Sequence, residues 1–173
     1  MEVEAQVSRG PSWLRRALVG RNPKITMVRL VLLILGCLVL FNFVLLPIRI
    51  QGPSMLPTYG ERGVNFVSLL AYTFHEPQRG DIVAIRTTGI HVMYMKRIIA
   101  LPGETIAFHH GHVLINGKLL YEPYVKFACD WEIPARSLSS NEYFVCGDNR
   151  SMPETDHEKG IANRNKIAGK VLL

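Results

Sequence analysis

Residues 30–46 read LVLLILGCLVLFNFVLL, an uncharged run in which Asn42 is the only strongly polar side chain. Extended through Pro47 and Ile48, the run reaches the lower end of the roughly 17–25 apolar residues that cross a hydrocarbon core as a helix. The stretch after it is much more polar and long enough for one compact domain. We therefore predict a transmembrane helix over 30–48 and a separate folded domain over 49–173.

The residues before the apolar run carry six basic side chains against two acidic ones. A cationic flank of this kind stays on the cytoplasmic side of a membrane. The prediction is a single-pass protein of the plasma membrane, with a cytoplasmic basic tail over 1–29 and an extracytoplasmic domain over 49–173. Because the tail carries most of the net charge of +6, the rest of the chain is too weakly basic to suggest a nucleic-acid-binding protein.

Two other interpretations of the apolar run are less consistent with its flanks. A cleavable signal peptide has a shorter apolar core followed by small residues, whereas Arg49 and Gln51 follow this run. Ile34–Cys37 faintly resembles a lipoprotein cleavage site, but the chain stays apolar well beyond it. Both observations favour an uncleaved anchor in the lipid bilayer.

The remainder of the chain is typical of a β domain. Short β-branched or alternating stretches are separated by turn residues, and Asn116-Gly117 is a strong signal for a two-residue hairpin. The predicted strands are 81–86, 91–100, 105–108, 112–115, 118–121 and 142–146. Val64–Thr73 is predicted as a short helix or loop along the membrane. This density of short strands predicts a mainly β fold, either an antiparallel β barrel or a folded-over sheet.

Ser54 lies in the segment Gly52-Pro53-Ser54-Met55-Leu56-Pro57-Thr58, a few residues beyond the apolar run. A serine becomes nucleophilic only when a base removes its proton, and Lys96 is the candidate base. A lysine serves as a base only when its amine is neutral, whereas its ordinary pKa is about 10.4. Burial must therefore lower this pKa by several units. A serine–lysine pair hydrolyses a peptide bond without histidine, metal or cofactor.

Lys96 lies in a predicted strand whose pattern supplies such burial. Alternation puts Val92, Tyr94 and Ile98 on the same face as Lys96, where the charged form of the amine is disfavoured. Taken alone, Lys96 is also consistent with a surface lysine on an edge strand, and Ser54 with an ordinary turn residue. The two residues become a candidate pair through their setting in the chain.

That setting resembles type I signal peptidases, which are membrane-bound Ser–Lys leader peptidases. Gly52–Thr58 resembles their nucleophile box, Arg79–Val83 the next box, and Tyr94–Glu104 the box that carries the lysine base. Gly147–Arg150 resembles the start of the last box, and Gly169-Lys170 fits the closing strand. The boxes occur in family order behind an N-terminal anchor. Their compact spacing is similar to the smaller, Gram-positive-type members, which lack a large inserted domain.

The resemblance implies a role for each matching residue. Ser54 is expected to attack the scissile carbonyl and Lys96 to take its proton. The backbone N–H of Ser54 is expected to stabilise the oxyanion. Gly52 stands where some members have a serine that adds a hydroxyl donor, so that donor is missing here. Asp148 and Asn149 are expected to brace the strand and turn near the pair.

The chain departs from the family pattern after Arg150. Aligned without gaps, Pro153 occupies the position of a serine that is expected to hydrogen-bond the lysine amine. Either Ser151 or Thr155 substitutes for that serine, or backbone and water orient the amine. Asp156 replaces the family's aspartate if the alignment slips by one residue. This departure bears on catalytic efficiency more than on catalytic identity.

The resemblance also implies that substrate binds as an extended strand beside the pair, with small residues before the cut as in Ala-x-Ala. The expected substrate-binding residues are Ile50, Gln51, Pro53, Met55, Val92, Met93, Tyr94 and Met95. A group of apolar residues is equally consistent with a surface that dips into the bilayer and with ordinary core. Its members are Phe66, Leu69, Leu70, Tyr72 and Phe74.

Other candidate sites have weaker support. The histidines of the turn 109–112 have no cysteine or carboxylate cluster near them in sequence, so no metal site is expected. No motif places His75 or His91 in a Ser–His–Asp triad. Cys146 is more typical of a core cysteine than of a thiol enzyme. Whether it pairs with Cys129 stays open at this stage.

The sequence therefore predicts a monomeric membrane serine endopeptidase that removes signal peptides from secretory preproteins. One alternative is a related Ser–Lys peptidase dedicated to a pilin or conjugation subunit. Another is a membrane-tethered domain that binds signal segments without cutting them. The presence of both Ser54 and Lys96 favours the enzyme.

Overall fold

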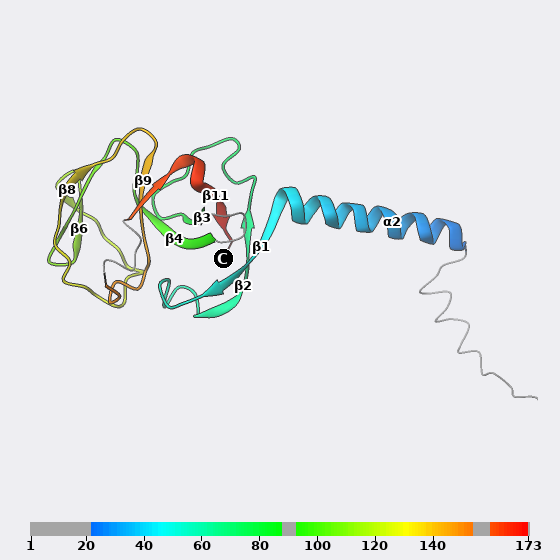
Figure 1. Cartoon of the computed structure of the whole chain (residues 1–173), viewed down its shortest axis with the longest axis horizontal. Coiled ribbons are helices and arrows are strands. Elements are labelled where there is room, and N and C mark those ends of the chain that lie inside the picture. The colour runs from blue at the N-terminus through cyan, green and yellow to red at the C-terminus, as the bar shows by residue number, and fades with distance from the viewer. Residues whose placement is uncertain (1–21, 88–92, 154–159, 173) are drawn as a thin grey trace, which may run out of the picture. The chain divides into compact units, whose positions relative to one another are not determined.

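The computed structural model describes residues 22–87, 93–153 and 160–172 (Figure 1). The chain divides into two units, 1–42 and 43–173. The first contains the helix α2 (Pro23–Val39), continued by a π-helical turn, η1 (Leu40–Val44). Asn22 caps α2 by accepting a hydrogen bond from the backbone N–H of Lys24, and Pro23 occupies the first turn. Proline is favoured there because its missing N–H is not needed.

The helical segment Pro23–Val44 is long and apolar enough to cross a membrane, with a mean hydropathy of 2.5 and no part buried by protein. Its bounds differ from the predicted helix over 30–48. The helix begins earlier than predicted, at the Asn22 cap and Pro23. It also ends earlier, because the chain is already extended at Leu45. Leu45–Ile48 had been predicted as helix because their composition continues the apolar run, but they pair with the neighbouring strand instead.

The second unit contains two sheets, in which every pair of named strands is antiparallel. The seven-stranded sheet has the order β1 (Leu45–Gln51), β2 (Arg62–Ser68), β11 (Ile167–Val171), β3 (Ile82–Arg86), β4 (Met93–Ala100), β9 (Glu142–Cys146), β10 (Ile161–Asn163). The four-stranded sheet has the order β7 (Lys118–Leu119), β6 (His112–Ile115), β5 (Thr105–His109), β8 (Ile133–Ser137). A short 3₁₀ turn, η3 (Arg164–Lys166), precedes β11. The mainly β, antiparallel prediction is confirmed.

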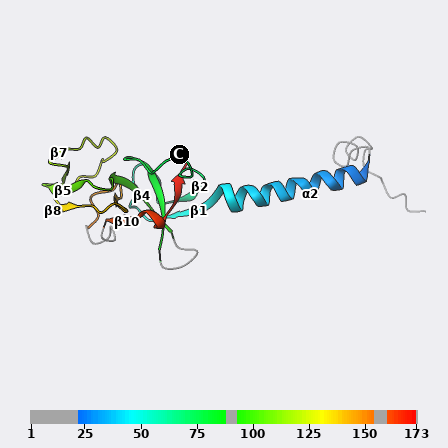
Figure 2. The same ribbon diagram turned by 90° about the horizontal axis from the view of Figure 1, so that it is seen from above.

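Within this unit the four-stranded sheet lies at the end opposite β1 and β2 in both views (Figures 1 and 2). Strands β3, β5, β6 and β9 begin and end within one residue of their predicted bounds. The Asn116-Gly117 hairpin is confirmed, since both residues have positive φ, 51° and 77°. The prediction of a helix or loop over 64–73 is wrong at its start, because Val64–Ser68 belongs to β2.

Alternation along β1 determines how the start of the β domain packs. Leu46, Ile48 and Ile50 pack against a core cluster that contains Met55 and Val67, while the residues between them are exposed. This inward face fixes the end of β1, and with it the loop that follows. No disulfide joins Cys129 to Cys146.

Candidate active site

Ser54 lies in the loop that connects β1 to β2. Gly52 opens this loop with a φ of 94°, a conformation that favours glycine, and its N–H donates to the carbonyl of Glu61 at 3.1 Å. Next to Ser54, Met55 is only 2% exposed and packs into the core cluster beneath β1. The loop is therefore closed at its base by the hairpin and anchored beside the serine by a buried side chain.

Asn149 holds the same loop from another part of the chain. Its backbone N–H donates to the carbonyl of Ser54 at 3.1 Å, and its side-chain amide donates to the carbonyl of Pro53 at 3.2 Å. The hydroxyl of Ser151 donates to Oδ1 of Asn149 at 2.7 Å. Asn149 thus binds two consecutive carbonyls of the loop that contains Ser54, and Ser151 is a partner of Asn149.

Asp148 is completely buried and ties the loop to β4. Its carboxylate accepts hydrogen bonds from Nε and Nη2 of Arg97 at 2.8 and 2.6 Å, and one from the hydroxyl of Thr58. Arg97 also lies over the ring of Tyr124, 4.0 Å from its centroid. One carboxylate therefore joins strand β4 to the loop that contains Ser54.

We expect Asp148→Ala to lower the free energy of unfolding by about 3–5 kcal/mol, because the change leaves the largely buried guanidinium of Arg97 without its counterion. The measurement is urea denaturation of the detergent-solubilised chain, followed by tryptophan fluorescence. The matched control is Asp130→Ala, which removes an exposed carboxylate. Equal stabilities of the two variants would contradict the bracing role.

Lys96 lies on β4, opposite Val83 of β3, and is only 4% exposed. Burial of an amine removes the water that stabilises its charged form. Cys146 lies in the core on β9, the strand that pairs with β4. Burial raises the pKa of Cys146 to about 11, so this cysteine is an inert core thiol and not a nucleophile.

A pocket of about 220 Å³ lies between strand β1, which leads into the loop of Ser54, and strand β4, which carries Lys96. Its walls are formed by β1 and by Met93–Met95 of β4, the three residues immediately before Lys96. Strand β1 is the outermost strand of its sheet, and β4 pairs with β9 only over Arg97–Ala100. The pocket lies between these two segments and includes Ser54.

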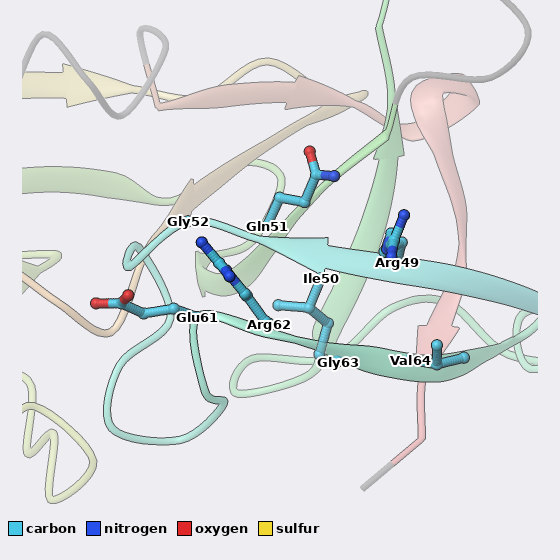
Figure 3. A pocket seen from close by; sticks show the side chains of 8 residues that line it. All are labelled: Arg49, Ile50, Gln51, Gly52, Glu61, Arg62, Gly63 and Val64. Carbon is cyan, nitrogen blue, oxygen red and sulfur yellow. The ribbon is translucent and has the colours of Figure 1, made fainter.

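A second pocket of about 580 Å³ continues along the β1–β2 hairpin (Figure 3). It shares the segment 49–52 with the first pocket and adds residues of β2. In the close-up, Ile50 points to the opposite side of β1 from Gln51 (Figure 3). The charged side chains of this second pocket are Arg49, Glu61 and Arg62. An open depression thus extends from the loop that contains Ser54 along the hairpin.

Most of the sequence-predicted site residues meet at the first pocket. They are Ile50, Gln51, Gly52, Ser54, Met55, Met93, Tyr94 and Met95. Pro53 contributes a carbonyl that is bound by Asn149, while Val92 and Thr155 lie outside the described residues. The sequence reasoning missed Ile48 and Arg49, which also line the pocket, because it treated 48 as the end of the membrane helix.

Arg97 and Thr58, the two partners of Asp148, were also missed. Arg97 directly follows Lys96, and Thr58 closes the nucleophile segment. A charged residue inside an otherwise apolar strand is a signal that a buried counterion exists, but nothing local identifies that counterion.

The five apolar residues between 66 and 74, which were consistent with either a membrane-contacting surface or ordinary core, fall into a buried and an exposed set. Leu69 and Tyr72 pack against core clusters, and the hydroxyl of Tyr72 donates to Asp81 at 3.0 Å. Phe66, Leu70 and Phe74 are 38%, 51% and 96% exposed. An exposed phenylalanine of this kind is typical of a surface that contacts a membrane or another protein.

The other sequence candidates are not assembled into a catalytic site. The ring of His75 is exposed beside Tyr72, with Nδ1 3.2 Å from the carbonyl of Glu76. His91 lies outside the described residues. The turn histidines His109 and His110 lie on the second sheet, at the turn after β5.

Comparison with known proteins gives consistent matches. The profile of the family described as signal peptidase, peptidase S26, matches residues 24–173. A signal peptidase I from Leptolyngbya laminosa is 33% identical over 132 residues, which is 72% of this chain and 65% of that protein. Signal peptidase I S from Bacillus subtilis is 33% identical over 153 residues, covering 81% of this chain and 82% of the relative. A crystal structure of a signal peptidase I from Enterococcus faecalis has a TM-score of 0.47 and 26% identity, covering 56% of this chain and 97% of that chain.

Proposed function

This chain belongs to the signal peptidase family, peptidase S26, and has the family's serine endopeptidase activity of removing signal peptides; from that premise we propose that Ser54 is its nucleophile and Lys96 its general base. The observation that carries this assignment is the pocket between β1 and β4. It includes Ser54 and is lined by the three residues before a buried lysine.

The proposed reaction begins when the neutral amine of Lys96 takes the proton of the Ser54 hydroxyl as its oxygen attacks the scissile carbonyl. The resulting oxyanion is stabilised by the backbone N–H of Ser54. The protonated amine then gives its proton to the leaving amino group, and an acyl-enzyme forms. Water, deprotonated by the same lysine, attacks the acyl carbon; the ester bond breaks and releases the signal peptide, and the lysine returns its proton to the oxygen of Ser54. No metal or cofactor takes part in this sequence.

The substrate proposal rests on the two strand segments that face the pocket. A signal peptide in extended conformation adds a strand between β1 and Met93–Met95, so that main-chain hydrogen bonds provide affinity. Alternate side chains then point into the small pocket beside Ser54. Its volume of about 220 Å³, shared between the side chains of two substrate residues, favours small ones before the cut.

We expect a bulky residue at the position before the cut to reduce cleavage by about 100-fold, since it does not fit the pocket. The experiment compares a secretory preprotein with Ala→Phe changes at the first and at the second position before the cut. The second change is the matched control, because that side chain points away from the pocket in an extended strand. Cleavage sites are identified by mass spectrometry. Equal rates for the two substrates would contradict the strand register.

We propose a single-pass membrane protein whose span is Pro23–Val44, with the basic N-terminus in the cytoplasm and the β domain outside. The span is supported by its length and hydropathy. The exposed Phe66, Leu70 and Phe74 offer a second apolar contact with the lipid surface. The enzyme acts as a monomer on preproteins presented at that surface. The alternatives, a dedicated peptidase for one subunit and a non-catalytic binding domain, are not favoured by the relatives.

A further inference from the structure

The turn between β5 and β6 brings two histidines to one carboxylate on the second sheet. Nδ1 of His109 lies 3.2 Å from Oε2 of Glu132, and Nδ1 of His110 lies 3.2 Å from Oε1 of the same side chain. The three ligand atoms all lie within 4.8 Å of one another. No carboxylate stands near these histidines in the sequence, so the sequence predicts no metal site there. Glu132 is 22 residues beyond His110 in the chain and reaches the turn only through the fold.

Strand pairing explains why the three residues meet. Phe108 of β5 is opposite Ile133 of β8, so that their neighbours His109 and Glu132 lie side by side at the end of the ladder. The turn continues through His110, which has a φ of 47°. The backbone N–H of His110 donates to Oε1 of Glu132 at 2.6 Å. The carboxylate is therefore held in place by backbone as well as by the two rings.

The chemistry of the cluster suits a divalent transition metal. Glu132 is exposed, and an exposed glutamate is ionised at neutral pH. A tetrahedral zinc ion with N and O ligands at about 2.0–2.2 Å needs ligand atoms roughly 3.3–3.5 Å apart. Both histidine–carboxylate distances, 3.2 Å, are close to that separation. The side chains are 66%, 79% and 53% exposed, so an ion has open access.

We propose that His109, His110 and Glu132 bind a divalent transition-metal ion of the zinc type, with water completing its coordination. Two imidazoles and one carboxylate favour Zn²⁺, Cu²⁺ or Ni²⁺ over Mg²⁺ and Ca²⁺, which require oxygen ligands. The bound ion ties the β5–β6 turn to the segment that leads into β8. The site is separate from catalysis, because its three ligands are not among the residues that line the Ser54 pocket.

The experiment uses the full chain in detergent, stripped of metal with a chelator. Zn²⁺ is titrated by isothermal calorimetry into the native chain and into Glu132→Gln, His109→Gln and His112→Gln. Glu132→Gln keeps an acceptor for the N–H of His110 but replaces a good zinc ligand with a poor one. The matched control, His112→Gln, removes an exposed histidine of the same turn that does not belong to the cluster. Signal-peptide cleavage by each variant verifies that it is folded.

We expect one Zn²⁺ per native chain, unchanged affinity in His112→Gln, and at least about tenfold weaker binding in the other two variants. Zn²⁺ but not Mg²⁺ is expected to raise the thermal unfolding temperature of the native chain and of His112→Gln, because only the folded state holds the ligands together. Equal affinity in all four proteins would assign the binding to other histidines and overturn the site. Absence of binding by the native chain at about 100 µM Zn²⁺ would overturn it as well.

Discussion

Ser54→Ala is expected to reduce signal-peptide cleavage by at least about 10⁴-fold, the scale on which loss of a catalytic serine acts. The substitution removes the hydroxyl that is proposed to form the acyl-enzyme and leaves the backbone N–H of residue 54 in place. Because the side chain is only half-buried and the loop is anchored by Met55 and Asn149, the fold is expected to persist. The measurement is the initial rate of preprotein cleavage in detergent micelles.

The control for this change is Ser137→Ala on β8. It removes an exposed hydroxyl that contacts Thr105 at 3.0 Å, on the second sheet. The control is expected to cleave at the native rate. Cleavage by Ser54→Ala within tenfold of the native rate would mean that another group attacks the carbonyl, and the proposed nucleophile would be wrong.

Lys96→Met is expected to have an effect of similar size, because no neutral amine is left to take the proton of Ser54. Methionine keeps the length of the side chain and suits the apolar surroundings of a residue that is 4% exposed. We therefore expect the thermal unfolding temperature to be unchanged or raised while cleavage is lost. Loss of cleavage without loss of thermal stability distinguishes a catalytic role of Lys96 from a structural one. Retained cleavage in Lys96→Met would require a different base.

Two further variants sharpen this test. Lys96→Arg is expected to be inactive as well, because a guanidinium stays charged and does not act as a base at neutral pH. Lys118→Met, on the exposed strand β7, is the matched control and is expected to cleave normally. Full activity of Lys96→Arg would show that the residue contributes charge and not proton transfer.

Local sequence patterns were sufficient to predict several strands of the β domain. The short apolar runs in His112–Ile115 and Glu142–Cys146, bounded by turn residues, predict β6 and β9 with their observed bounds, because the signal for each lies in the local sequence. Strand β1 (Leu45–Gln51) was not predicted at all, and over Leu45–Ile48 the apolar composition of the anchor simply continues. These residues form a strand because Pro47 pairs with Phe66 and Ile48 pairs with Asn65. No property of the segment alone reveals this pairing.

In the candidate site, too, some residues are indicated by local motifs and others only by the fold. The nucleophile segment and Lys96 were identified from their motifs, yet Arg97 as the partner of Asp148 was not. A buried charge predicts a counterion without indicating where in the chain it lies. The proposed metal site shows this most clearly. Its two histidines are adjacent in sequence, whereas its carboxylate lies 22 residues beyond His110.

By itself the sequence indicated the membrane-length helix, the β class of the domain and the two residues that we propose to perform hydrolysis. These depend on composition, alternation and short motifs, all of which are local. Only the tertiary structure decided that Ser54 shares a pocket with Met93–Met95, that Lys96 is buried, and that Glu132 meets two histidines. The physical reason is that burial and proximity depend on which strands pair and in which register, and pairing joins segments that are distant in the chain.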